Sequence, residues 1–168
     1  EGAARGAKGY VGFILGTGTN TAYLENGEVI NVESGGFDKL PTTEIDREVD
    51  AATNNLGKQI FEKMISGTYL GPLTLAALKQ APLSDGGKQA VAEMESLHMI
   101  QVDNFAEQNG RDIGPFSDSR FSESDGELIR AVFAAIVTRA AHLSAVNLAV
   151  AAIRNGVSPI CINLDGST

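Results

Sequence analysis

Three apolar, strand-like runs follow one another near the start of this chain, and only short turns separate them. They cover residues 10–15, 21–25 and 28–33. The dipeptide Asn26-Gly27 between the last two runs tolerates the positive φ angles that a two-residue hairpin requires. Because connections this short cannot carry the chain back along a sheet, neighbouring strands must run antiparallel. The sequence therefore predicts an antiparallel meander of three strands.

The connection between the first two runs, residues 16–20, concentrates groups that bind ligands. Gly16 and Gly18 let the backbone approach a ligand without a Cβ atom in the way. The other residues add hydroxyl and amide groups: Thr17, Thr19 and Asn20. We expect such a turn to hold an anion or a sugar. It lacks the Lys of a P-loop, and a strand follows it where a dinucleotide fingerprint has a helix. A plain glycine-rich hairpin is the alternative interpretation.

The middle of the chain has helical patterns interrupted by glycine and proline. Thr42 or Thr43 is suited to cap a first helix, which the run at 54–57 ends. A second helix is predicted over 58–66, and a third is predicted to begin at Pro72, because proline favours the first helical position. Two short helices are expected within 84–109 around a turn near 98–101, and a loop over 110–123.

The longest predicted helix lies near the end of the chain. Ser124 and Glu127 have the spacing of a capping box, and Gly156 is the expected end. A helix of about thirty residues would extend on the order of 45 Å. Because it is rich in alanine and apolar on nearly all sides, we expect it to be buried against a sheet. Residues 157–164 then predict a strand, and Asp165-Gly166 predicts a turn.

Length, charge and cysteine content limit the class of protein. A chain of 168 residues suits one domain. Its net charge of −8 argues against a nucleic-acid partner, because phosphate binding relies on basic residues. No apolar stretch is interpreted as long enough to span a bilayer, so no membrane partner is expected. The single cysteine, Cys161, is interpreted as a buried, inert thiol, which suits a reducing cytoplasm.

Two carboxylates accompany the ligand-like turn. Glu33 ends the third strand-like run, and Glu62 lies in the second predicted helix. Carboxylate oxygens accept hydroxyl hydrogens strongly, so both residues together with Asn20 suit a neutral polyol. A solvated strand-end charge for Glu33 and a surface ion pair for Glu62 are the alternatives. No metal site is predicted, because His98 and His142 lack neighbours at ligand spacing.

Several stretches resemble the hexokinase family in their order and approximate spacing. The resemblance runs from about residue 10 to 168 and is weakest between 80 and 125. The matching stretches are 11–23, 31–37, 44–50, 57–71, 138–143 and 163–167. The resemblance implies an α/β fold, the large domain of a sugar kinase of the actin-like ATPase (ribonuclease H-like) class. In that fold the antiparallel meander is extended by later parallel strands and packed by helices.

The resemblance also implies a reaction. Hexokinases transfer the γ-phosphoryl group of MgATP to the 6-hydroxyl of glucose or a related hexose, so ATP and Mg²⁺ are the implied cofactors. Asn20, Glu33 and Glu62 would hold sugar hydroxyls. Gly16, Thr17 and Gly18 would approach the transferring phosphates, and Gly166 and Ser167 would approach the adenosine side.

Some features of the hexokinase family have no counterpart in residues 1–168, and this leads to further expectations. The family's catalytic aspartate is expected upstream of Glu1, together with the small domain. Residues 1–168 are therefore interpreted as a partial large domain that also lacks its C-terminal end and is inactive alone. Apolar surface left open in this way would favour self-association. Ser34 replaces a common Trp and Leu56 a common Pro, which leaves open a catalytically silent, sugar-binding or regulatory relative.

Overall fold

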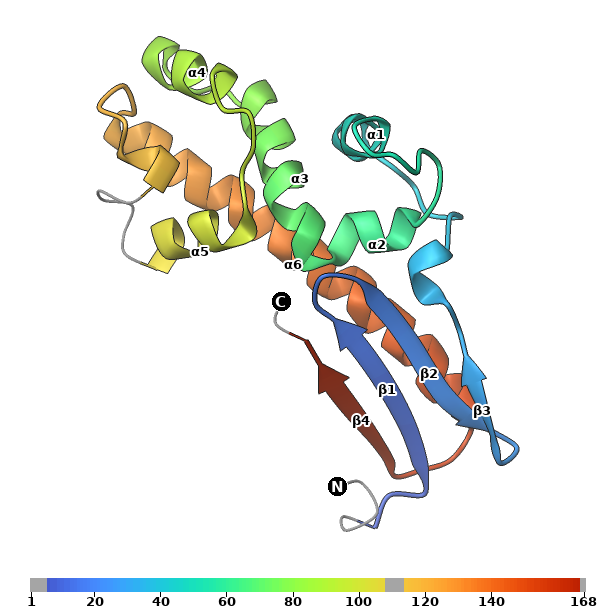
Figure 1. Ribbon diagram of the computed structural model, residues 1–168. Helices are drawn as coiled ribbons and strands as arrows, with labels where there is room; N and C mark the ends of the chain where they lie inside the picture. Colours follow the sequence, from blue (N-terminus) through green and yellow to red (C-terminus); the bar gives the residue numbers. More distant parts are fainter. Residues whose placement is uncertain (1–5, 108–113, 167–168) are drawn as a thin grey trace.

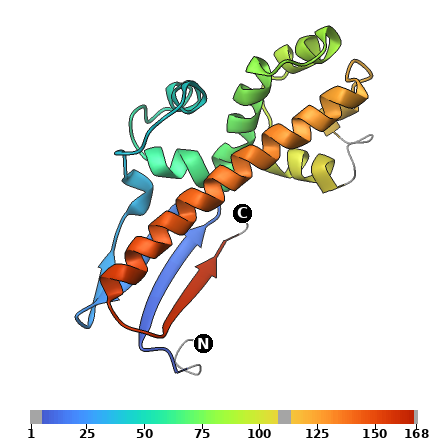
Figure 2. The same cartoon turned by 180° about the vertical axis from the view of Figure 1, so that it is seen from behind.

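A computed structural model describes residues 6–107 and 114–166 of the chain. A four-stranded sheet occupies one end of the molecule, and a group of helices occupies the other (Figure 1). The long helix α6, Glu123–Asn155, runs through both parts and lies across one face of the sheet (Figure 2). The strands that begin and end the described chain therefore meet in one sheet.

The predicted meander is confirmed. Positive φ angles of 54° at Asn26 and 85° at Gly27 form its hairpin turn. Thr19 and Asn20 already belong to the second strand, so the first connection is only residues 16–18, called the early turn below. In this turn the Gly16 N–H donates to the Gly18 carbonyl at 3.0 Å. The three antiparallel strands are β1 (Gly9–Leu15), β2 (Thr19–Glu25) and β3 (Glu28–Asn31).

The last strand, β4 (Ile160–Asp165), runs parallel to β1 and gives the sheet order β3-β2-β1-β4. A parallel neighbour requires a crossover connection, which α6 supplies. Gly156 ends α6 with a φ of 73°, as predicted for a glycine cap. Because β4 lies at the edge of the described sheet, Cys161 is only half-buried, against the expectation of a buried thiol.

Five shorter α-helices precede α6 in the described part of the chain. Of the two predicted candidates, Thr42 and Thr43, it is Thr43 that caps the first, with its hydroxyl accepting from the Asp46 N–H. The third begins at Gly67, so the prediction that it begins at Pro72 is wrong. The Ser66 carbonyl accepts from the N–H groups of Tyr69 and Leu70, and these bonds start the helix before the proline is reached. The helices are α1 (Glu44–Ala51), α2 (Ile60–Ile65), α3 (Gly67–Gln80), α4 (Asp85–Ala92) and α5 (Met99–Glu107).

The start of α6 also differs from its prediction. Its capping box is formed by Ser122 and Asp125, whereas Ser124 and Glu127 were predicted from the same spacing. Asp125 is 2% exposed and also accepts hydrogen bonds from the backbone N–H and the hydroxyl of Ser84. Contact with a distant part of the chain therefore decides between two equivalent local signals.

One side of α6 is exposed, against the expectation of burial on nearly all sides. Val146, Val150 and Ile153 are 63%, 56% and 77% exposed. The opposite side packs against β2 and α3. By length and composition alone, α6 is long and apolar enough to cross a membrane. The expectation that no apolar stretch is long enough is therefore wrong. Core helices of soluble proteins pass the same test.

Two apolar clusters hold these elements together. The sheet-side cluster joins β1, α1, α2, the first half of α3 and the middle of α6: Phe13, Val49, Phe61, Met64, Ile65, Leu70, Leu73, Ala76, Ile136 and Ala140. The helical cluster joins the second half of α3 to α4, α5, the 3-10 turn Gly114–Ser117 and the start of α6: Leu75, Leu78, Ala81, Leu83, Val91, Leu97, Val102, Phe105, Phe116, Ile129 and Phe133.

Candidate functional site

Glu62 lies against the early turn. Its Oε2 accepts a hydrogen bond from the Thr19 N–H at 3.1 Å. A Cβ atom on Gly18 would come within 2.7 Å of the same oxygen, so only glycine leaves room for this carboxylate. The neighbouring Lys63 pairs with Asp50 at 2.6 Å. Glu62 therefore turns toward the glycine-rich turn, while the lysine beside it turns toward the connection between α1 and α2.

Asn20 and Glu33 are joined through a third residue, Asn31. The Asn20 amide donates to Asn31 Oδ1 at 2.7 Å, and the Asn31 amide donates to Glu33 Oε1 at 2.5 Å. Asn20 Oδ1 in turn accepts from the Ser34 N–H at 3.2 Å. These bonds fix which way the Asn20 amide points. The sequence prediction overlooked Asn31, although an antiparallel register places it diagonally opposite Asn20, where side chains meet.

Two residues of this site adopt the left-handed backbone conformation that side chains rarely adopt. The φ angles are 53° at Glu33 and 54° at Gln59. Such strain costs about 1–2 kcal/mol per residue and gathers at functional sites. The Oε1 atom of Gln59 is buried and has no hydrogen-bond partner among the described residues. It lies over Gly35, where a Cβ would approach it to 2.9 Å. Gln59 is a site residue that the sequence prediction did not identify.

Ser34, which departs from the family pattern, supports Asn20 from the buried side. Its hydroxyl lies 3.0 Å from that of Thr21, and the side chain is 3% exposed. The Asn147 amide of α6 donates to the same Thr21 hydroxyl at 2.6 Å. Ser34 thus connects Asn20, through Thr21, to the long helix. Leu56, the other departure, is 67% exposed and packs into neither apolar cluster.

The end of β4 reaches the early turn from the other side of β1. Gly166 has a φ of 135°, and a Cβ there would overlap the Leu15 carbonyl and lie 3.0 Å from the Gly16 nitrogen. Only glycine permits this approach. Residues that are distant in sequence therefore form one continuous backbone surface. Ser167, the partner predicted for Gly166, lies outside the described residues.

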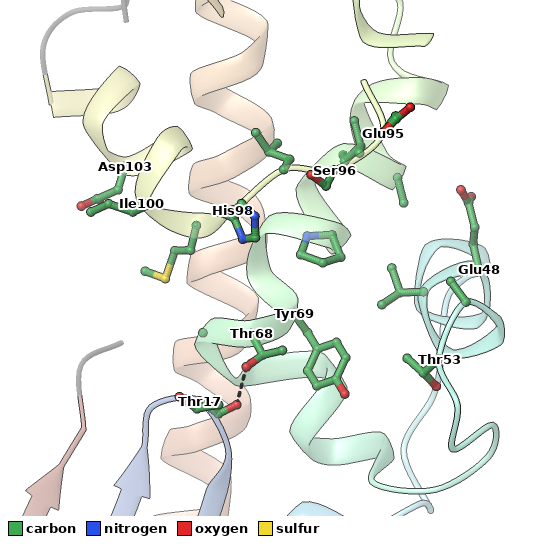
Figure 3. A pocket seen from close by; sticks show the side chains of 18 of the residues that line it. Thr17, Glu48, Thr53, Thr68, Tyr69, Glu95, Ser96, His98, Ile100 and Asp103 are labelled. Atoms are coloured by element: carbon green, nitrogen blue, oxygen red, sulfur yellow. Dashed lines mark hydrogen bonds between the residues drawn. The ribbon is translucent and has the colours of Figure 1, made fainter. Parts of the chain in front are cut away.

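A cavity of about 760 Å³ opens on the far side of the early turn. Gly16 and Thr17 line it, and the Thr68 hydroxyl at the start of α3 donates to the Thr17 carbonyl at 2.7 Å (Figure 3). Such a volume is typical of small-molecule sites. Further lining residues include Glu48, Tyr69, Lys79, Glu95, His98 and Asp103.

The charges around this cavity are mostly negative. Burial, followed by the negative charges of Glu62 and Asp50, raises the pKa of Tyr69, so its hydroxyl stays protonated at neutral pH. Carboxylates on the wall disfavour a bare anion and favour one that arrives with a cation. Within residues 6–107 and 114–166, no group of three or more His, Cys, Asp or Glu side chains has the geometry of a metal site.

The early turn thus lies between two different environments, whereas the sequence predicts a single ligand-binding turn. The polar cluster of Asn20, Glu33 and Glu62 lies on one side, and the cavity beside Gly16 and Thr17 lies on the other. The geometry places carboxylate and amide side chains next to a glycine-rich backbone turn.

Comparison with known proteins gives one consistent result. The sequence model of the family described as Hexokinase matches residues 10–168. A hexokinase of Plasmodium falciparum is 32% identical over 179 aligned positions, covering 94% of this chain and 36% of that protein. Hexokinase HKDC1 of Homo sapiens is 36% identical over 166 positions, covering 83% of this chain and 18% of that protein.

Solved structures give the same answer. A crystal structure of a hexokinase superposes with a TM-score of 0.79 at 30% identity, covering 94% of this chain and 39% of that one. A hexokinase from Schistosoma mansoni complexed with glucose superposes with a TM-score of 0.77 at 27% identity, covering 94% and 42%. The chain therefore spans less than half the length of these relatives, and the expected α/β, actin-like ATPase fold is confirmed.

Proposed function

Because this chain belongs to the hexokinase family, we propose that the protein carrying it phosphorylates a hexose. The reaction would transfer the γ-phosphoryl group of MgATP to the 6-hydroxyl of glucose or a related hexose. The observation that carries this proposal is the early turn, which has sugar-type acceptors on one side and a cavity on the other.

The polar cluster supplies the sugar half of the proposed site. Glu33 and Glu62 would accept hydroxyl hydrogens, and charge-assisted bonds of this kind are the stronger ones. Asn20 would offer its remaining amide hydrogen, because Asn31 and Ser34 already fix its orientation. Neutral sugars are bound by such directional bonds, since they carry no charge of their own.

The early turn and Gly166 supply the phosphate half. Gly16, Thr17 and Gly18 would approach the transferring phosphates, and Gly166 with Ser167 would approach the adenosine. Phosphoryl transfer depends on positioning and charge stabilisation more than on covalent catalysis. A bound Mg²⁺ would neutralise charge on the phosphate oxygens. The carboxylates on the cavity wall agree with a nucleotide that arrives together with its cation.

The proposal assigns no catalytic base to the described residues. Both site carboxylates, Glu33 and Glu62, are used here to hold the sugar. We propose that the base comes from another part of the protein, and that residues 1–168 alone, a partial large domain, do not phosphorylate glucose.

A coupled assay with glucose and MgATP tests the proposal on the full-length protein. Glucose 6-phosphate should form, and Asn20→Ala should reduce its rate of formation. No sugar phosphate from the full-length protein would overturn the proposal. Calorimetric titration with glucose in the absence of ATP separates the alternative, because binding without turnover identifies a catalytically silent, sugar-binding or regulatory relative. Turnover by residues 1–168 alone would disprove the predicted inactivity of this segment.

A further inference from the structure

Lys63 is a buried cation that the proposed reaction does not use. It is 3% exposed, and its ammonium group donates three hydrogen bonds. The acceptors are Asp50 Oδ1 at 2.6 Å, Thr53 Oγ1 at 2.8 Å and the Asn55 carbonyl at 3.0 Å. All three belong to the end of α1 or to the connection that follows it. An ammonium is almost never fully buried without such partners.

The same connection is also held by Asp50. Its two carboxylate oxygens accept the Gly57 N–H at 3.1 and 3.0 Å. Burial would raise the pKa of Asp50, but the hydrogen bonds from Lys63 and Gly57 outweigh it and lower the pKa. Asp50 therefore stays ionised and connects the cation to residue 57. We call residues 50–57, held in this way by Lys63, the lysine clasp.

The clasp ends next to two residues of the proposed sugar site. Gln59 follows it in the left-handed conformation, with its buried Oε1 lying over Gly35. Glu62 precedes Lys63 and contacts the early turn. The helix that carries Glu62, α2, has only six residues, and so short a helix has almost no stability of its own. The orientation of Glu62 must therefore come from contacts outside the helix.

We propose that Lys63 is a positioning residue of the sugar site. By fixing the α1–α2 connection to α2, it sets the direction in which Gln59 and Glu62 face the early turn. This inference rests on the proposed function, because the ligand to be positioned is a hexose. Lys63 touches neither the sugar side nor the cavity, so its effect acts through Gln59 and Glu62.

Steady-state kinetics on the full-length protein test the proposal. Lys63→Met should raise the KM for glucose at least tenfold and lower kcat by a smaller factor. Lys58→Met is the matched control, because Lys58 is an exposed lysine of the same segment. Its KM should equal that of the wild type. An unchanged glucose KM in a folded Lys63→Met protein would overturn the proposal.

A second variant separates positioning from folding. Lys63→Met leaves the Asp50 carboxylate without its cation, which itself destabilises the protein. The double variant Lys63→Met/Asp50→Asn removes both charges, so its melting temperature should recover while the raised KM persists. If the KM returns to the wild-type value together with the melting temperature, Lys63 has only a structural role.

Amide hydrogen exchange tests the clasp without any sugar. In Lys63→Met the Gly57 amide should exchange at least tenfold faster than in the wild type, and in Lys58→Met it should not. Equal exchange in wild type and Lys63→Met would disprove the clasp. If the wild-type protein bound no hexose, the proposed function would fail, whereas the exchange result would still decide whether Lys63 orders the connection.

Discussion

The helical part of this molecule and the surroundings of the early turn are held together in different ways. The helical part is built on a continuous apolar cluster that includes the aromatic contacts of Phe116 with Phe105 and Phe121, at ring distances of 4.8 and 5.9 Å. One buried carboxylate, Asp125, adds a polar link. Around the early turn the key contacts are instead polar and directional, and they involve Asn20, Asn31 and Glu62.

The difference between apolar packing and directional hydrogen bonds gives a physical reason for the strong and weak stretches expected in the resemblance to hexokinases. From the sequence, the weakest resemblance is expected between residues 80 and 125, a region that lies mostly in the helical part. An apolar cluster tolerates exchange among residues of similar volume. A hydrogen bond to a particular atom at the early turn does not, because both length and angle must be kept. We therefore expect recognisable sequence strings to lie at the polar contacts.

The largest stability effect is expected where the first half of α3 packs against residues 97–99 of the helical part. A Cβ on Gly71 of α3 would overlap the Leu97 carbonyl and lie 2.8 Å from the Met99 nitrogen. Gly71→Ala should therefore destabilise the protein by about 3 kcal/mol, since backbone atoms cannot move aside as side chains do. Urea unfolding followed by circular dichroism measures this. A midpoint equal to that of the wild type would contradict tight packing of α3 on residues 97–99.

Glu62→Gln at the early turn is expected to affect activity rather than stability. The loss of a charged acceptor should lower kcat/KM for glucose roughly 10- to 100-fold, because hydrogen bonds to charged groups contribute about 1.5–3 kcal/mol. The melting temperature should change little. The control is Glu28→Gln, a change of the same kind at an exposed position of β3. Equal loss of activity in both variants would remove Glu62 from the sugar site.

Asp125 is a buried carboxylate in the helical part, and it makes the free energy of unfolding depend on pH. Although burial alone would raise its pKa, hydrogen bonds from Ser84 and Ser122 hold that pKa at about 2, below the ordinary 3.8. A depressed carboxyl pKa contributes stability above the unfolded value and loses it as pH falls toward the folded value. The contribution should therefore be complete above about pH 5 and disappear near pH 2.

The variant Asp125→Asn checks this dependence. It should cost about 2 kcal/mol at pH 7, because an amide hydrogen would face a backbone donor, and the difference from wild type should shrink as the solution is acidified. Urea unfolding at a series of pH values measures both. A constant difference from pH 7 down to pH 3 would show that the carboxylate charge is not responsible.

The smallest effect compares two glycines in the helical part. At Gly126 of α6 a Cβ would meet only the Phe105 ring at 3.7 Å and Arg130 at 3.8 Å. Gly126→Ala should stabilise the protein by about 0.5–1 kcal/mol, since alanine favours a helix interior. At Gly87 of α4 a Cβ would approach the Asp125 carboxylate to 2.9 Å, so Gly87→Ala should destabilise. Thermal melting of both variants measures these effects. A change of melting temperature in the same direction for both would contradict the predicted difference between the two glycines.

Much of the fold was predictable from local patterns. The meander, the Asn26-Gly27 hairpin, the Thr43 cap and the Gly156 helix end depend on residues close in sequence. The errors occurred where local signals were equivalent or incomplete. Pro72 is favourable at a helix start, yet Ser66 starts α3 earlier. Ser122 and Ser124 carry the same capping signal, and only the packing of Asp125 against Ser84 selects the first.

The candidate site divides in the same way. The glycines and polar residues at 16–20 were predicted from their residue types, and Glu33 and Glu62 were assigned to the sugar through the resemblance to hexokinases. Asn31, Gln59 and Lys63 were not identified. Their residue types are ordinary, and their importance depends on which distant atoms they meet.

Local sequence determined which segments form strands, turns and helices, because backbone preferences and apolar periodicity act between near neighbours. Tertiary structure alone decided which partner each polar side chain takes. Glu62 and Lys63 are adjacent on one short helix, yet one reaches the early turn and the other the α1–α2 connection. Buried polar groups must find partners, and those partners exist only once distant segments pack together.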